Sequence, residues 1–232
     1  MSPNDPRLAK ARVHIGGAGR VGTAVALALQ ASGVGRVSCN DPQALDEEQL
    51  HCCVFSRRSD VGRPKVHVLQ QLFDGRPGFI FEPVVAPNES AQVTPWVEQA
   101  DVVVCCANQL PARLHLERTA IALRKPSVQA SVQDGRRALG GMISAWVPDA
   151  DCCCFGCLFP NPNMRFSRDE VLLPTVTTAI GSIAAQRIID LLINNRTPAI
   201  ASRPNLLIVD LARYAIEQLS VNRRKGCRCC GR

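Results

Sequence analysis

A glycine-rich turn near the start of the chain constrains its fold more than any other feature. The stretch GAGRVG places Gly17, Gly19 and Gly22 at the GxGxxG spacing. It follows a short apolar run that ends at Ile15 and precedes an Ala-, Leu- and Val-rich segment, Val21–Ala31, typical of a buried helix. Such a turn brings the N–H groups of a helix N-terminus close to phosphates. The order of strand, glycine loop and helix therefore predicts a nucleotide-binding unit.

An aspartate further along supports this interpretation. Asp41 closes a second predicted strand, Arg36–Asn40, and follows the first glycine of the motif by 24 residues. A carboxylate in that place can accept hydrogen bonds from ribose hydroxyls. The pattern fits a dinucleotide cofactor and ATP equally, and turn chemistry without a ligand is the alternative.

Strand and helix signals alternate over the first two thirds of the chain. The run DVVVCC at 101–106 has no polar alternation, as expected for a strand buried on both faces of a parallel sheet. The order indicates an α/β fold with a doubly wound, Rossmann-like, mostly parallel sheet. Further strands are expected at 79–85, 127–132, 140–147 (antiparallel) and 205–209, and helices at 65–73, 90–99 (capped by Ser90), 111–123 and 177–194. Residues 212–221 fit a helix or a strand.

Twelve cysteines stand out among 232 residues. Their share, about 5%, is below the roughly 8–10% of a disulfide scaffold. The N-terminus has no apolar signal segment. No apolar run in the sequence approaches the ~18 residues that a membrane span needs. We therefore expect a cytoplasmic protein without a membrane span, whose cysteines are reduced.

Two CxxC pairs stand far apart in the chain. Cys154 with Cys157 and Cys227 with Cys230 together supply four thiolates, which suits a closed tetrahedral zinc site. Such a site would pin the C-terminal tail to the domain. A shift of the ligand set by one position stays open, because further cysteines stand beside the pairs at 152, 153 and 229. Unliganded thiols are the alternative. Cysteines 39, 105 and 106 lie in apolar strands and are expected in the core.

The formal net charge is +7, yet the basic residues are scattered except near the C-terminus. No aromatic residues stand among the terminal arginines, as a single-strand binder would need. We interpret the tail as solvated and expect no nucleic-acid partner.

From about residue 12 to residue 230, the motifs and their order along the chain resemble those of the ThiF/MoeB family of adenylating enzymes. The resemblance rests on GAGRVG, ASGVGR before the strand that ends at Asp41, DVGRPK, DVVVCCANQLPAR, CFGCLFP, TAIGSIAAQRIIDLL and GCRCC. It implies residues 1–12 as a short N-terminal extension and residues 13–232 as a single nucleotide-binding domain, with the zinc-knuckle region and tail at 149–232.

Family members adenylate the C-terminal glycine of a small ubiquitin-like sulfur carrier, or of a peptide, with ATP and Mg²⁺, and form homodimers. The resemblance implies that the motif glycines lie under the phosphates, that Asp41 holds the ribose, and that Lys65 contacts the phosphates. Arg113 matches a family arginine, for which a structural ion pair is the alternative. The four CxxC cysteines match the family's zinc ligands.

Several family positions are changed. The family loop NLxRQ reads Gln49-Leu50-His51-Cys52-Cys53, so its arginine is absent. The magnesium-organising aspartate falls on Asn108, a weaker ligand for a hard dication. One phosphate glycine is Arg20, and the family's N-terminal helix, which donates an arginine to the partner subunit's site, is missing. Arginines 20, 57, 58 and 63 lie on neighbouring loops and are candidates to replace the lost arginine; solvated side chains are the alternative for all four.

The sequence is compatible with three functions. The first is an active adenylyltransferase. The second is a degenerate member that binds a nucleotide, a partner or a leader peptide without catalysis. The third, a nicotinamide-dependent oxidoreductase, leaves the paired CxxC motifs and VGRPK unexplained.

Overall fold

The structure is a computed structural model that describes residues 5–50, 56–132, 139–148, 150–161, 164, 173–194 and 204–231. The strands found in them are β1 (Arg12–Gly16), β2 (Arg36–Asn40), β3 (Ile80–Val84), β4 (Val102–Cys105), β5 (Ser127–Val132), β6 (Gly140–Trp146), β7 (Leu206–Asp210) and β8 (Ala215–Leu219). The helices are α1 (Pro6–Lys10), α2 (Arg20–Ala31), α3 (Lys65–Gln71), α4 (Thr94–Gln99), α5 (Leu110–Ala122), α6 (Phe155–Leu158) and α7 (Pro174–Asn194), with 3₁₀ turns η1 (Glu47–Gln49) and η2 (Arg58–Asp60).

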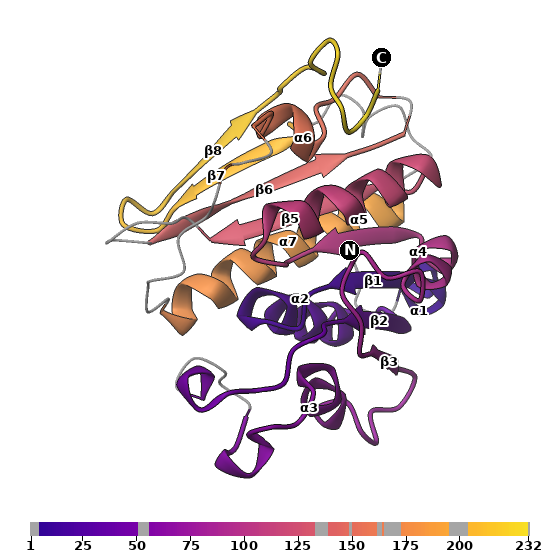
Figure 1. The fold of residues 1–232 in the computed structure, drawn as a ribbon, viewed down its shortest axis with the longest axis vertical. Helices are drawn as coiled ribbons and strands as arrows, with labels where there is room; N and C mark the ends of the chain where they lie inside the picture. Colours follow the sequence, from indigo (N-terminus) through magenta and orange to yellow (C-terminus); the bar gives the residue numbers. More distant parts are fainter. Residues whose placement is uncertain are drawn as a thin grey trace.

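The strands form one mixed sheet in the order β3-β2-β1-β4-β5-β6-β7-β8 (Figure 1). The five strands from β3 to β5 are parallel, and β6, β7 and β8 continue the sheet antiparallel. The chain moves outward to one side through β2 and β3 and then to the other through β4 and β5. Open α/β sheets bind ligands at such a switch point, beyond the carboxyl ends of the strands. The predicted fold class is confirmed.

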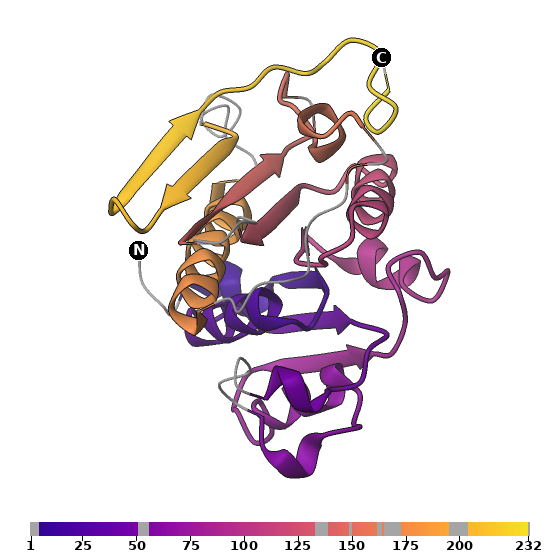
Figure 2. The same cartoon turned by 60° about the vertical axis from the view of Figure 1, so that its left-hand side comes forward.

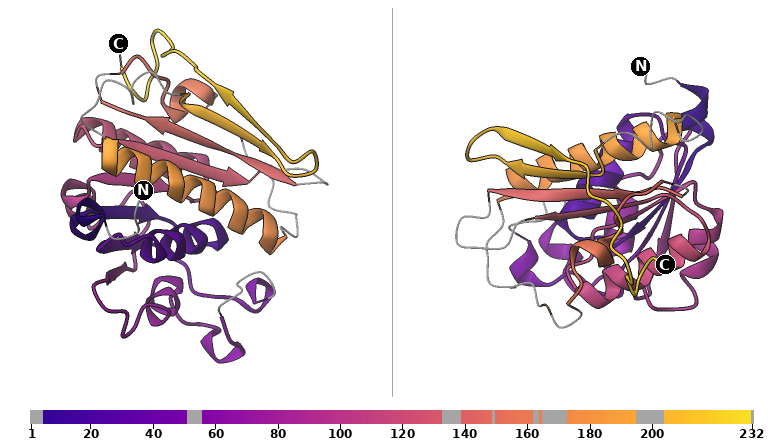
Figure 3. Two further views of the ribbon diagram at one scale, coloured as in Figure 1. Left: turned by 180° about the vertical axis from the view of Figure 1, so that it is seen from behind. Right: turned by 90° about the horizontal axis from the view of Figure 1, so that it is seen from above.

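Helices cover both faces of the parallel part, which explains the continuous apolar run of β4. Val102 and Val104 pack into one core cluster with residues of α2 and α7. The alternate residues Val103 and Cys105 pack into a second cluster with side chains of α5. Figure 3 shows α2 and α7 on one side of the sheet and α5 with α6 on the other. Both faces of β4 are therefore buried by helices.

Helix α7 is long and apolar enough to cross a membrane by length and composition alone, with a mean hydropathy of 1.4. The expectation that no segment reaches this length is wrong by that measure. In the structure the helix packs against α2, β5 and β6, and 56% of the apolar window is buried. Ile180, Ala184 and Ile188 belong to the core. Packing inside the domain accounts for the apolar composition of α7.

Other local predictions need correction. Ser90 does not cap α4, because its Oγ accepts a hydrogen bond from the N–H of Gln92 (3.2 Å) and the helix begins only at Thr94. Within the expected N-terminal extension, α1 forms and buries Leu8 in the core. The segment 212–221 contains the strand β8. Cys52, Cys53 and most of the loop at 160–175 lie outside the described residues.

The chain after β8 returns across the molecule. Figure 2 shows this C-terminal segment, in yellow, running from the β7–β8 hairpin past α6 and ending near α5. The backbone N–H of Cys153 bonds to the carbonyl of Val221 (3.0 Å), so the segment is already fastened before its last cysteines.

Candidate functional site

The glycine loop lies at the switch point, where β1, β2 and β4 end together. Gly17 has φ +108°, a left-handed conformation that favours glycine, and its N–H bonds to the carbonyl of Asn40 (2.8 Å). A Cβ on Gly22 would collide with the carbonyl oxygen of Gly17. A Cβ on Gly19, in contrast, would meet no atom within 4 Å. Two glycines thus permit close packing, and the third leaves the N-terminus of α2 open to a ligand.

Asp41 ties β2 to this loop. Its Oδ2 accepts a hydrogen bond from the N–H of Ala18 (2.8 Å), and its Oδ1 accepts one from the N–H of Gln43 (2.8 Å). The residue is buried, with 7% of its surface exposed. Each carboxylate oxygen keeps acceptor capacity for a ribose hydroxyl. The structure therefore brings Asp41 and the glycine loop together, as the sequence predicted.

Gln43, a residue that the sequence did not point to, links Lys65 to Asp41 by hydrogen bonds to both. The backbone N–H of Lys65 donates to the carbonyl of Gln43 (3.0 Å), and its Nζ donates to Oε1 of Gln43 (2.7 Å). Only 7% of the lysine is exposed. Lys65 takes part in none of the ion pairs found among the described residues. Its ammonium group is held in place by a neutral amide, and no described carboxylate forms an ion pair with it.

The four candidate arginines differ in their ion pairs and in their distance along the chain from the glycine loop. Arg58 pairs with Glu47 (2.8 Å) and Arg63 pairs with Asp60 (2.8 Å). Arg57 is exposed on the same turn. Arg20 is half-buried and opens α2 directly after Gly19. Arg20 is therefore the candidate whose backbone adjoins the glycine loop.

Gln49 and Asn108 occupy the remaining predicted positions. Gln49 lies in η1, and its buried Oε1 has no hydrogen-bond partner among the described residues. Asn108 is exposed just after β4, at the same sheet edge as the glycine loop. Among the described residues, groups of three or more potential metal ligands occur only at the cysteines discussed below. In the part of the chain that the structure describes, no carboxylate cluster for magnesium lies at the nucleotide edge.

Arg113 is buried and connects several elements of the fold. It is 3% exposed, and its guanidinium donates to the carbonyls of Cys105 (3.2 Å) and Ala130 (2.8 Å). It also donates to Oε1 of Gln129 (3.2 Å) and stacks 5.4 Å from the ring centre of Phe155. These contacts join α5 to β4, β5 and α6. They favour the structural alternative over the catalytic role, with carbonyl and amide oxygens as the partners of Arg113 in place of an ion pair.

A buried polar network under the glycine loop was also missed. His14 Nδ1 lies 2.9 Å from the hydroxyl of Ser38, and Nε2 lies 3.1 Å from Oδ1 of Asn40. The amide of Asn40 donates to Oδ1 of Asn88 (2.9 Å), which leaves Oδ1 of Asn40 to accept from His14. Burial lowers the pKa of His14 to about 4. Its position in an apolar strand was the only sequence signal for this neutral histidine.

The two CxxC pairs meet in space. The Sγ atoms of Cys154, Cys157, Cys227 and Cys230 lie within 4.8 Å of one another. Neighbouring sulfurs are 3.6–3.7 Å apart, too far for a disulfide. Tetrahedral Zn–S bonds of 2.3 Å would place sulfurs about 3.8 Å apart, so the donor set and its size fit zinc.

Two cysteines next to the four-cysteine cluster, Cys152 and Cys229, do not belong to it. The Sγ of Cys152 accepts a hydrogen bond from the N–H of Val147 (3.3 Å) and lies outside the cluster. Cys229 is grouped with Glu117 and Cys154. The carboxylate of Glu117 is buried and accepts from the N–H of Phe155 (2.7 Å), and burial raises its pKa to about 8. Burial likewise raises the pKa of Cys106 to about 12, as expected for a core thiol.

The chain is similar to known proteins over nearly its full length. The chain is 27% identical over 228 residues to the sulfur carrier protein ThiS adenylyltransferase of Escherichia coli, covering 97% of this chain and 88% of that protein. It is 28% identical to the adenylyltransferase and sulfurtransferase uba4 of Emericella nidulans, over 97% of this chain but only 48% of that protein. The fold matches a crystal structure of E. coli MccB with ATP at a TM-score of 0.77 and 19% identity, over 97% and 68% of the two chains.

The match extends beyond single relatives. The sequence model of the ThiF family covers residues 3–229, which include the glycine loop, Asp41, Lys65 and three of the four clustered cysteines; Cys230 lies one residue beyond the match. The nicotinamide-oxidoreductase alternative gains no support from these comparisons. The chain belongs to the ThiF family of adenylyltransferases.

Proposed function

We propose that this chain uses ATP to adenylate the C-terminal carboxylate of a small ubiquitin-like sulfur carrier or of a peptide, as a cytoplasmic homodimer. The observation that carries the proposal is the link from the glycine loop through Asp41 and Gln43 to Lys65. The relative from E. coli is named for its action on such a carrier, ThiS.

The reaction joins two negatively charged groups. A carboxylate oxygen of the substrate attacks the α-phosphorus of ATP, the bond to the bridging oxygen breaks, and pyrophosphate leaves. The open N-terminus of α2 at Gly19 offers N–H groups to the phosphates, and Asp41 holds the ribose. The charge of Lys65 stabilises the negative charge that develops at phosphorus. Arg20 supplies a second positive charge beside the loop.

Magnesium would enter mainly on the phosphates of ATP, because such sites usually take few protein ligands. Asn108 is the side chain at this edge that would contribute an oxygen. The missing carboxylate cluster makes the expected affinity of the site for Mg²⁺ low.

Zinc has a separate, structural place in the proposal. Cys154 and Cys157 at α6 and Cys227 and Cys230 on the C-terminal segment would hold it. Four thiolates close the coordination shell, so the ion would clip the tail to the domain and activate no water.

A binding subunit without catalysis is the second candidate function. Two of the four substitute arginines, Arg58 and Arg63, are engaged by carboxylates, and the magnesium aspartate is Asn108. Each change weakens catalysis more than binding. This candidate predicts that ATP or a partner binds and that no adenylate forms.

ATP–pyrophosphate exchange tests the choice. With a carrier protein that ends in Gly-Gly, the wild-type protein should exchange label, and K65A should lose about 100-fold or more. K10A, an exposed lysine of α1 outside this site, is the matched control and should keep the wild-type rate. No exchange by folded protein that still binds ATP would favour the binding subunit.

A further inference from the structure

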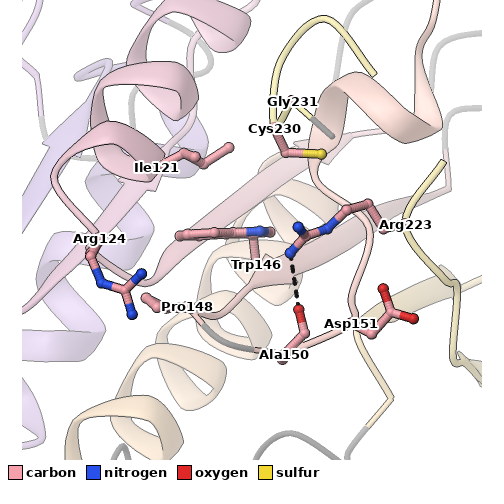
Figure 4. Close-up of a pocket in the computed structure, with 9 residues that line it drawn as sticks. All are labelled: Ile121, Arg124, Trp146, Pro148, Ala150, Asp151, Arg223, Cys230 and Gly231. Atoms are coloured by element: carbon pink, nitrogen blue, oxygen red, sulfur yellow. Dashed lines mark hydrogen bonds between the residues drawn. The ribbon is translucent and has the colours of Figure 1, made fainter. Parts of the chain in front are cut away.

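A cavity of about 520 Å³ lies away from the nucleotide edge (Figure 4). Its floor includes Trp146, which pairs with Ser127, the first residue of the parallel strand β5. The cavity is therefore at the amino end of the parallel strands, opposite the glycine loop. Ile121 and Pro148 supply apolar walls, and the C-terminal segment closes one side. The volume is in the usual range for small-molecule sites.

Two buried donors line this cavity without acceptors. The indole Nε1 of Trp146 and the Nε of Arg223 are both buried, and neither has a hydrogen-bond partner among the described residues. Trp146 itself is 6% exposed. Both groups are donors only, and a buried unpaired donor costs free energy. A ligand that accepts hydrogen bonds would remove that cost.

The charges around the donors favour an anion. Arg223 is held by a hydrogen bond from Nη2 to the carbonyl of Ala150 (3.1 Å), and Figure 4 shows its guanidinium facing the indole nitrogen of Trp146. Arg124 lies on the other side of the indole ring. The opposing charge is Asp151, which is exposed and lies beyond Arg223 in the same view. The unpartnered Nε of Arg223 and indole N–H of Trp146 are thus the donors that line the cavity, and the described carboxylate that lines it, Asp151, is exposed to solvent.

We propose that this cavity binds a small molecule that carries a carboxylate or phosphate group on a flat or apolar body. The oxyanion would accept from Trp146 and Arg223, and the body would pack on Ile121 and the indole face. Because Trp146 is on β6 and Arg223 on the C-terminal segment, the ligand would bridge the two. The inference is independent of the proposed adenylation site.

Intrinsic fluorescence offers a direct test, since the chain has two tryptophans. In W96F the remaining tryptophan, Trp146, reports on the cavity. Benzoate and inorganic phosphate are titrated separately, and sodium chloride controls for ionic strength. We expect a saturable fluorescence change with at least one of the two anions. A response to benzoate alone indicates a carboxylate ligand, and a response to phosphate alone indicates a phosphate ligand.

Two further variants make the test specific. W96F/R223Q should bind the responding anion at least ten-fold more weakly, whereas W96F/R224Q, changed at the exposed neighbouring arginine, should bind as W96F does. Equal zinc content in all variants verifies folding. The proposal is overturned if neither anion gives a saturable change, if chloride gives the same change, or if R223Q leaves the affinity unaltered.

Discussion

The Oδ2 atom of Asp41 accepts a 2.8 Å hydrogen bond from the backbone N–H of Ala18, which joins the end of β2 to the glycine loop. The same carboxylate reaches Gln43 through its other oxygen, and Gln43 holds Lys65. The proposed ribose and phosphate contacts would therefore be coupled through a single aspartate. A change at Asp41 should disturb both parts of a bound nucleotide.

We predict that D41N weakens ATP binding by about ten-fold to a hundred-fold, because hydrogen bonds to charged groups are worth roughly 1.5–3 kcal/mol. Isothermal titration of ATP measures the change. D46N is the matched control, since Asp46 also accepts a 2.8 Å bond from a backbone N–H, that of Gln49, but on the exposed 3₁₀ turn. Equal loss of affinity in the two variants would argue against a ribose contact by Asp41.

The two glycines that flank the start of α2 should respond differently to alanine. G22A places a methyl group against the carbonyl of Gly17 and should lower the free energy of unfolding by about 1–3 kcal/mol or more. G19A has open space and should cost less than about 1 kcal/mol, the scale of a helix-cap change. It should nevertheless weaken ATP binding. Denaturant melts and ATP titrations of both variants check this, and a stable G19A with unchanged affinity would contradict the phosphate placement.

Restoring a carboxylate at Asn108 should strengthen the response to magnesium. We predict that N108D reaches half-maximal activity at a lower Mg²⁺ concentration than the wild-type chain, because a hard dication prefers a carboxylate to an amide. Q109E adds the same charge at the next exposed residue and serves as control. An identical magnesium dependence in all three proteins would place the ion away from residue 108.

Stability should fall in mild acid because of His14. Its pKa is near 4 in the folded state, against about 6.5 in the unfolded chain, so the unfolded state binds the extra proton. The stabilising contribution is complete above pH 6.5 and is lost as the pH falls towards 4. Between pH 7 and pH 5 the free energy of unfolding should fall by about 2 kcal/mol from this group. Urea melts should show that H14Q lacks this part of the pH dependence; an unchanged slope would contradict the assignment.

Zinc content should identify the thiol ligands. C227S is expected to retain less than about half an equivalent of zinc, whereas C229S keeps about one, because Cys229 lies beside the set and not in it. Loss of zinc should also expose the C-terminal segment to proteases. Full zinc content in C227S, or loss of it in C229S, would shift the ligand set by one position.

Periodicity and short motifs predicted much of the fold. The central parallel strands could be predicted because both of their faces are buried, as in VVVC of β4. Strand β8 was ambiguous because four of its five residues are exposed, so its pattern carries little burial signal. Helix α1 is five residues long and depends on burial of Leu8 against the domain, which local sequence cannot show.

The site was predicted where chemistry is tied to a motif and missed where it depends on long-range contacts. Asp41 meets the glycine loop, and the two CxxC pairs meet each other at a separate site, as the motifs indicated. Gln43 belongs to no motif, and its role depends on the chain at residue 43 folding back onto residue 65, a contact that local sequence does not encode. Arg113 was assigned by family position, yet its donors are used by carbonyl oxygens of the sheet.

The most direct test of the central claim is mass spectrometry of the acyl product. The purified chain is incubated with ATP, Mg²⁺ and a small carrier protein that ends in Gly-Gly and is encoded beside its gene. We expect a carrier heavier by AMP less one water, formed by the wild-type chain and by K10A and greatly reduced in K65A. A carrier of unchanged mass, in the presence of folded and ATP-bound enzyme, would contradict it.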